Sequence, residues 1–306
     1  MKILVTGGAG FIGSHLVDAF LQQGHGVAVI DNLVTGQREN LNPNATFYEM
    51  DIRDAAVKEV FQQEKFDVVC HQAAQMDVRK SVDDPRYDAE VNILGTLNLL
   101  QASVATGVKK FLFASTGGAI YGEQIEFPAT EEHPTWPASP YGVSKLTCEK
   151  YIHYYSQVYH LQYALLRYAN VYGPRQNPHG EAGVVAIFTK KMLAGEQPVI
   201  NGDGKQTRDY VYVGDVVDAN LRALQYPEND YFNVGTGIET DVNHIFHFIR
   251  EAVGADIPEQ HGPAKPGEQR RSVLSYEKAK KLLGWEPKVK LPEGITRTVE
   301  YFRGID

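Results

Sequence analysis

A glycine-rich turn at residues 7–13 constrains the fold more than any other feature of this sequence. The chain opens with an apolar run, 3–6, and then reads Gly-Gly-Ala-Gly-Phe-Ile-Gly before an amphipathic stretch that predicts a helix over 13–23. Glycines at Gly7, Gly10 and Gly13 let a strand turn sharply into a helix, and they let backbone N–H groups approach a pyrophosphate at the helix N-terminus. The turn therefore predicts a strand–turn–helix unit that binds a dinucleotide.

Short apolar runs alternate with longer amphipathic stretches through the first half of the chain. The apolar runs predict buried strands at 3–6, 26–31, 67–70, 110–115 and 163–168, and helices are expected at 55–63, 89–105 and 140–159. This alternation predicts an α/β protein with a doubly wound, Rossmann-like parallel sheet.

The sequence changes character after residue 173, which predicts a smaller C-terminal substrate-binding lobe. We expect the dinucleotide-binding domain at about 1–173 plus 208–252, and the lobe at about 174–207 plus 253–306. The run 210–213, with a helix from Asp215, is expected to return to the main sheet.

Composition and charge exclude several classes of protein. The chain has 38 acidic and 30 basic side chains among 306 residues, a formal net charge of -8, which argues against nucleic acid or an anionic membrane as the main partner. No apolar run approaches the ~18 residues that span a bilayer. The two cysteines, Cys70 and Cys148, form no CxxC pair and fit a reducing compartment. We expect a cytoplasmic protein without a metal site.

An acid at the end of the second predicted strand favours NAD. Asp31 stands at about the spacing expected for the residue that binds the adenosine ribose. A carboxylate there accepts ribose hydroxyls and repels a 2′-phosphate, although Arg38 leaves NADP open. Asp51 and Ile52, between the second predicted strand and the predicted helix 55–63, are candidates to hold the adenine, the alternative for Asp51 being a plain strand-end cap.

A tyrosine and a lysine at helical spacing predict proton transfer from an alcohol. Tyr141 and Lys145 are four residues apart, so they share a helix face. A free tyrosine has a pKa near 10, and both a lysine cation and a positive nicotinamide ring favour its phenolate. The strand ending in Ser115 and Thr116 supplies a hydroxyl, Thr116 being favoured, that can share the substrate's proton. The alternatives are a solvated Tyr–Lys pair and, for Thr116, a turn residue.

Several ordered motifs together resemble one family over almost the whole chain. They are TGGAGFIGSH (6–15), DNL (31–33), HQAAQ (71–75), STGGAIYG (115–122), SPYGVSK (139–145), LRYANVYGPR (166–175), GDGKQTRDYVYV (202–213) and FNVGTG (232–237). The chain resembles the extended short-chain dehydrogenase/reductases, and within them the UDP-glucose 4-epimerase group of NAD-dependent sugar epimerases/dehydratases. The resemblance implies bound NAD, a UDP-sugar substrate and a homodimer formed through helices near 89–105 and 140–159.

The resemblance also implies the reaction. Related dehydratases and decarboxylases carry acids just after the Ser/Thr, where this chain has Gly117, Gly118 and Ala119. The chemistry is therefore expected to stop at C4 of a UDP-hexose, through a transient 4-keto sugar. UDP-glucuronate or UDP-N-acetylglucosamine 4-epimerisation stays open, as does another nucleotide-sugar oxidoreduction.

Site residues are carried over by position. Thr116, Tyr141 and Lys145 would be catalytic. The residues that would line NAD are Gly7, Gly10, Phe11, Ile12, Gly13, Asp31, Asn32, Asp51, Ile52, Ala73, Ala74, Gln75, Tyr141, Lys145 and Tyr168. The residues that would bind the substrate are Arg79, Thr116, Asn170, Arg175, Val184, Val185, Arg208, Lys265, Glu268 and Ser272.

Four kinds of substrate contact are implied within that set. Asn170 and Arg208 match the family's diphosphate contacts. Lys265 and Glu268 stand where the family closes the nucleotide site with Arg and Asp. Ser272 matches a residue that limits the size of the sugar, and its small side chain leaves an N-acetylated hexose open. Either Arg79 or Arg175 could instead meet a C6 carboxylate.

Overall fold

A seven-stranded parallel sheet forms the centre of the computed structural model, which describes residues 1–178, 183–264 and 269–305. The strand order is β10-β6-β5-β4-β1-β2-β3, and every neighbouring pair is parallel. The strands are β1 (Lys2–Thr6), β2 (Gly26–Asp31), β3 (Thr46–Glu49), β4 (Val68–His71), β5 (Lys110–Thr116), β6 (Gln162–Tyr168) and β10 (Asp230–Val234). The predicted doubly wound sheet is confirmed.

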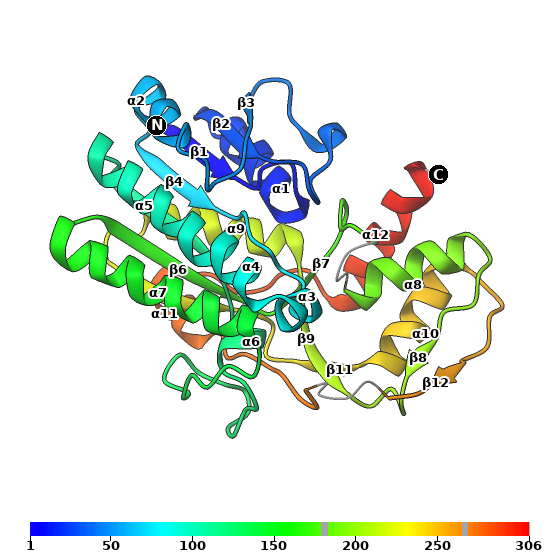
Figure 1. Cartoon of the computed structure of the whole chain (residues 1–306). Coiled ribbons are helices and arrows are strands. Elements are labelled where there is room, and N and C mark those ends of the chain that lie inside the picture. The colour runs from blue at the N-terminus through cyan, green and yellow to red at the C-terminus, as the bar shows by residue number, and fades with distance from the viewer. Residues whose placement is uncertain (179–182, 265–268, 306) are drawn as a thin grey trace.

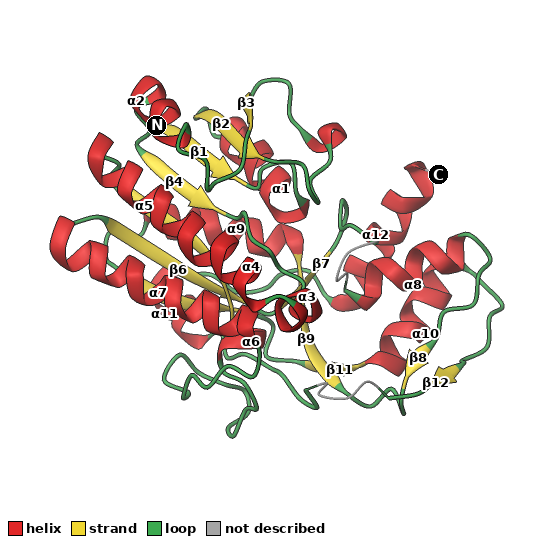
Figure 2. Cartoon of the chain, in the orientation of Figure 1, coloured by secondary structure: helices red, strands yellow, loops and turns green. Residues whose placement is uncertain are grey.

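Helices cover both faces of this sheet, as Figure 2 shows. On one face lie α1 (Phe11–Gln22) and α9 (Val213–Gln225), and on the other lie α2 (Val57–Glu64), α5 (Gly95–Thr106) and α7 (Pro140–Tyr159). Alternate residues of β1 supply both cores, because Ile3 and Val5 pack in the first and Leu4 in the second. This explains why the central strands are apolar along their whole length rather than alternating.

The chain also forms shorter helical segments. They are η1 (Arg38–Asn40), α3 (Val78–Asp83), α4 (Pro85–Ala89), a π-helical turn η2 (Glu90–Leu94), α6 (Gly117–Ile120) and α11 (Glu277–Leu283). The predicted helix 89–105 is thus interrupted by a π-helical turn before α5 begins. Within the described ranges, no helix combines the length and apolar character that crossing a membrane requires.

A second group of helices lies apart from the sheet, at the right of Figure 1. It contains α8 (Val184–Leu193), α10 (Val242–Val253) and α12 (Leu291–Ile305), with the short strands β8 (Ile200–Asn201) and β12 (His261–Gly262). These three helices share a core of their own, which includes Phe188, Phe246 and Ile295. The predicted domain boundaries stay a prediction. The shared core places α10 with the lobe, whereas the predicted boundaries put 208–252 in the dinucleotide-binding domain.

One strand pairs elsewhere than expected. Strand β9 (Thr207–Tyr212) pairs with β7 (Asn170–Tyr172) and β11 (Glu239–Asp241) in a separate three-stranded sheet. The expectation that 210–213 returns to the main sheet was wrong, because an apolar run indicates burial but not the partner strand. The strand that returns is β10, beside β6. The pairing of β7 with β9 brings two predicted substrate residues, Asn170 and Arg208, onto one small sheet.

Candidate active site

The glycine turn has no room for side chains at its two ends. Gly7 has φ +70°, and a Cβ there would lie 2.7 Å from the backbone nitrogen of Ala73. A Cβ on Gly13 would lie 2.1 Å from the carbonyl oxygen of Gly7. Gly10 caps α1, whose first turn carries Phe11 and Ile12. Because the strand order reverses between β1 and β4, this helix N-terminus faces the edge where doubly wound sheets bind nucleotides. The cradle fits a pyrophosphate held by backbone N–H groups.

The carboxylate of Asp31 is held rigidly at the end of β2. Its oxygens accept hydrogen bonds from the backbone nitrogens of Ala9 (3.0 Å) and Leu33 (2.8 Å). Burial raises the pKa of Asp31, and these two hydrogen bonds act in the opposite direction. Arg38 is engaged elsewhere, in an ion pair with Glu49. The geometry therefore favours a ribose with a free 2′-hydroxyl over one with a 2′-phosphate.

The next residues along this edge are tied together by Asp51. Its carboxylate accepts from Asn32 Nδ2 (2.9 Å) and from Arg53 Nε (2.8 Å). The Arg53 hydrogen bond lowers the pKa of Asp51 to about 2, so this carboxylate is charged at neutral pH. Ile52 is buried under Gly95, where a Cβ would lie 2.5 Å from Ile52 Cδ1. Asn32, Asp51 and Ile52 thus form one side of the candidate adenine site.

The loop after β4 lies directly beside the glycine turn. The backbone nitrogen of Ala73 donates to Thr6 Oγ1 (3.2 Å), and that of Gln75 donates to Asn92 Oδ1 (2.9 Å). Ala74, between them, is half-buried. This loop is therefore fixed at both ends, at the place where the resemblance puts the cofactor.

The predicted tyrosine–lysine pair lies at the start of α7. Ser139 caps the helix by accepting from the nitrogen of Gly142 (3.2 Å). The Lys145 Nζ atom lies 6.0 Å from the centroid of the Tyr141 ring and donates to the carbonyl oxygen of Ala114 (2.9 Å). Burial lowers the pKa of Lys145 to about 8. The pair that spacing predicted is thus assembled, with the ammonium buried beneath the phenol.

The two hydroxyls at the end of β5 have different partners. Ser115 is 3% exposed and its Oγ donates to Glu149 Oε1 (2.6 Å). Thr116 is half-buried, and a Cβ on Gly118 would lie 3.7 Å from Thr116 Oγ1 and 3.8 Å from Asn170 Oδ1. Thr116 and Asn170 therefore border one space, and the geometry favours Thr116 over Ser115 as the hydroxyl that meets substrate.

The remaining substrate candidates lie on the lobe side. Val184 and Val185 begin α8, where Val184 is half-buried and Val185 lies within the lobe core. Arg208 is half-buried on β9, with Nη1 donating to the carbonyl of Thr207 (2.8 Å). Ser272 is 2% exposed. Lys265 and Glu268 lie outside the described residues.

Three further candidates have other partners or are exposed. Arg175 forms an ion pair with Asp18 of α1 (2.8 Å). Arg79 is exposed on α3. The phenol of Tyr168 is buried and hydrogen-bonded to Asn220 of α9, and burial raises its pKa. Their assignment to cofactor or sugar stays a prediction.

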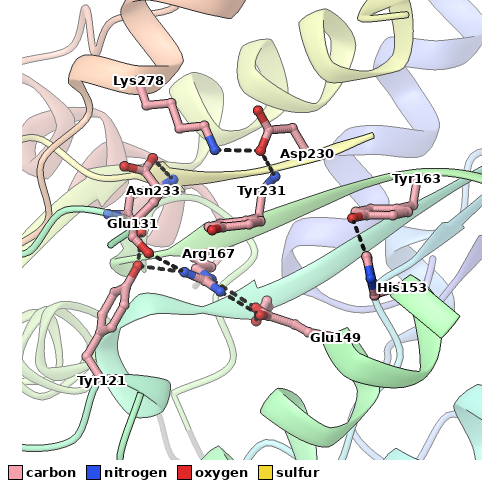
Figure 3. Close-up of polar contacts among 11 residues, drawn as sticks. Tyr121, Glu131, Glu149, His153, Tyr163, Arg167, Asp230, Tyr231, Asn233 and Lys278 are labelled. Atoms are coloured by element: carbon pink, nitrogen blue, oxygen red, sulfur yellow. Dashed lines mark hydrogen bonds and ion pairs between the residues drawn. The ribbon is translucent and has the colours of Figure 1, made fainter. Parts of the chain in front are cut away.

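Sequence analysis missed a buried ion pair next to the catalytic helix. Glu149 lies one turn after Lys145, and Arg167 Nη2 of β6 lies 2.7 Å from Glu149 Oε2, with side-chain exposures of 5% for Arg167 and 3% for Glu149. Figure 3 shows the pair, with the hydroxyl of Tyr121 accepting from Arg167. A signal for it was present, since an arginine interrupts an otherwise apolar predicted strand. Through Ser115, this pair joins β5, β6 and α7.

Hydride removal from an alcohol carbon requires a base for the hydroxyl proton and a cofactor that takes the hydride. The Tyr141 phenol can be that base, and the glycine turn is built for a dinucleotide. Fold and site together define a dinucleotide-dependent enzyme that acts on an alcohol.

The chain belongs to the NAD-dependent epimerase/dehydratase family, whose sequence model matches residues 3–235. A UDP-glucose 4-epimerase from Mycolicibacterium smegmatis is 48% identical over 310 residues, covering 99% of each chain. The crystal structure of the UDP-glucose 4-epimerase from Thermotoga maritima with UDP-glucose is 53% identical, with a TM-score of 0.98 over 100% of this chain and 99% of that one. The Thermus thermophilus UDP-glucose 4-epimerase in complex with NAD is 48% identical, with a TM-score of 0.96 over 100% of both. The family resemblance read from the motifs is confirmed.

Proposed function

We propose that this protein interconverts UDP-glucose and UDP-galactose by epimerisation at C4, using bound NAD. The observation that carries the proposal is the approach of Tyr141 and Lys145 at the sheet edge beside the glycine turn. Gly117 is packed against Leu274, where a Cβ would lie 2.4 Å from Leu274 Cδ1. A side chain at that position would have to displace Leu274, and the chain carries no acid there for further chemistry at C5 or C6.

The chain's own groups perform the proton transfers. The Tyr141 phenolate takes the proton of the C4 hydroxyl, and Thr116 Oγ1 hydrogen-bonds the same oxygen. The Lys145 ammonium stabilises the phenolate by its charge. NAD, when bound, supplies the hydride acceptor at C4 and the hydride donor for the return step. Tyr141 then returns the proton to the oxygen of the inverted alcohol.

Inversion requires a firm hold on the diphosphate and a loose hold on the sugar. Asn170 and Arg208 lie on the small sheet of β7 and β9, and Asn170 borders the same space as Thr116, which suits a fixed diphosphate next to a mobile sugar ring. We propose that Lys265 and Glu268 complete this grip. We propose Ser272, whose side chain is small, as the residue that limits the size of the sugar.

We further propose a cytoplasmic homodimer that pairs through α5 and α7. Apolar side chains form an exposed stripe along α7, with Val143 at 49%, Tyr154 at 50% and Val158 at 49% exposure. Their spacing places them on one face of the helix. An unpartnered apolar stripe on a long surface helix supports contact with a second copy. Both cysteines are buried and free, which fits a reducing compartment.

The test is turnover of UDP-galactose by the purified protein without added cofactor. UDP-glucose is the expected product. Tyr141→Phe is expected to retain NAD and lose about 10²–10⁴-fold in kcat, whereas Tyr301→Phe on α12 keeps the wild-type rate. A panel with UDP-glucuronate and UDP-N-acetylglucosamine distinguishes the other 4-epimerases. Turnover that needs added NADH indicates a net reductase, and silence with every UDP-sugar contradicts the proposal.

A further inference from the structure

A fully buried carboxylate lies between the cofactor loop and the catalytic helix. Asp88 of α4 is 0% exposed. Its oxygens accept from Gln75 Nε2 (2.9 Å), Asn92 Nδ2 (3.0 Å) and Ser144 Oγ (2.6 Å). These donors come from the loop after β4, from the π-helical turn η2 and from α7. One side chain therefore connects three segments that are distant in sequence.

Two of these donors fix the loop that the cofactor is expected to touch. Asn92 donates to the carbonyl oxygen of Gln75 and accepts from its backbone nitrogen, both at 2.9 Å. Asn92 lies in the π-helical turn, a distortion that recurs at functional sites. The third donor, Ser144, directly precedes Lys145. The Asp88 network thus sets the position of the loop relative to the Tyr141–Lys145 face of α7.

The hydrogen-bond partners of Asp88 carry no positive charge that would offset its negative charge. Gln75, Asn92 and Ser144 are all neutral groups. Glu149, a buried acid on α7, differs because Arg167 pairs with it. A buried charge acts strongly on its neighbours, since little water screens it.

The buried ammonium of Lys145 belongs to the residue that directly follows Ser144, the α7 partner of Asp88. Several titratable groups surround Lys145. Tyr141, Cys148 and Glu149 share its helix, and His71 faces it from β4. Burial keeps His71 neutral by lowering its pKa well below the ordinary value, and burial raises the pKa of Cys148 to about 11. The charge of Asp88 acts on Lys145 in the direction that retains the proton.

We propose that Asp88 is a positioning residue for the reaction: it fixes the cofactor loop to α7, and its buried negative charge acts on the Lys145 ammonium. The inference rests on the proposed function, because it assigns its role through Lys145.

Two variants separate the charge from the hydrogen bonds. Asp88→Asn preserves the shape, and its amide can donate to Ser144 Oγ, which accepts as readily as it donates. This variant removes the charge and keeps the acceptor oxygen for Gln75 and Asn92, while the hydrogen bond with Ser144 reverses its direction. Ser144→Ala removes one hydrogen bond and keeps the charge. The measurement is kcat/KM for UDP-galactose against pH, with bound NAD quantified for each variant.

Asp88→Asn is expected to move the alkaline limb of the profile to lower pH by about one unit, because Lys145 then loses its proton more easily. Ser144→Ala is expected to retain less NAD with the alkaline limb at the wild-type pH. An unmoved limb in Asp88→Asn, or an equal movement in Ser144→Ala, overturns the inference while the proposed function stands. If Asp88→Asn does not fold, Asp88→Ser removes the same charge and is measured in its place.

A measurement independent of turnover decides the inference even for a protein without activity. The free energy of urea unfolding at pH 7 is measured for the double-mutant cycle of Asp88→Asn and Lys145→Met. Asp88→Asn is expected to cost more stability with Lys145 present than with Met at that position. Equal costs in both backgrounds overturn the proposal.

Discussion

Removing Arg167 is expected to destabilise the protein strongly. The Arg167→Met variant leaves Glu149 buried at 3% exposure, with its charge unpaired and with Ser115 as a remaining donor. Breaking a buried ion pair from one side costs about 3–5 kcal/mol. An unfolding entropy of about 2.1 cal/mol/K per residue over 306 residues converts that loss into a fall in Tm of about 5–8 °C.

Calorimetry and urea unfolding measure this loss, and two further variants interpret it. Arg167→Met with Glu149→Met removes both charges and is expected to recover most of the stability, because apolar replacements of buried pairs are often neutral. Lys280→Met breaks the exposed pair with Glu286 (2.8 Å) and is expected to leave Tm unchanged. A fall in Tm below about 2 °C for Arg167→Met, the size expected for a surface pair, would refute the reasoning.

Three other perturbations test separate parts of the site. Gly13→Ala places a Cβ 2.1 Å from a backbone oxygen and is expected to abolish NAD binding. The control Gly304→Ala adds a Cβ in open space and is expected to keep NAD bound. The measurement is the amount of NAD bound per chain. Thr116→Val is expected to lower kcat about 10²–10⁴-fold at unchanged Tm. Ser115→Ala loses its hydrogen bond to the buried Glu149 carboxylate and is expected to lower Tm. Equal effects of the two variants on kcat would contradict the choice of Thr116 as the catalytic hydroxyl. Asp51 has a folded pKa of about 2, below its ordinary 3.8, so its contribution to stability is present above about pH 4 and is lost as the pH falls toward 2. Asp51→Asn is expected to reduce the change with pH of the free energy of urea unfolding over that window. An unchanged dependence on pH would count against this assignment.

Local patterns were sufficient for the main sheet and for the catalytic helix. The glycine turn, the apolar runs and the spacing of Tyr141 and Lys145 depend on neighbours within a few residues, and such neighbours are visible in sequence. The Ser–Pro pair before Tyr141 likewise marked the start of α7, where Ser139 caps the helix. These features were predicted because local sequence determines them.

Contacts between distant segments were not predictable in the same way. The hydrogen bond from Ser144 to Asp88 joins residues 56 positions apart. The pairing of Asn170 with Tyr210 joins two strands whose apolar residues do not indicate which strand pairs with which. Asn92 lies inside the helix predicted over 89–105, which has an ordinary amphipathic pattern, and Asp88 directly precedes that helix. Their burial depends on the π-helical turn and on α7 packing against it, and both appear only in three dimensions.

The lobe core of α8, α10 and α12 has a consequence for how such a protein can diversify. Val184 at the start of α8 packs against the lobe core, which is separate from the two layers around β1 and β4, whereas β9, which carries Arg208, contributes to both the lobe core and one of those layers. Replacements within the lobe can therefore reshape the space for the sugar while hydride transfer and proton transfer keep their geometry. New substrates become accessible to this scaffold without rebuilding its redox machinery.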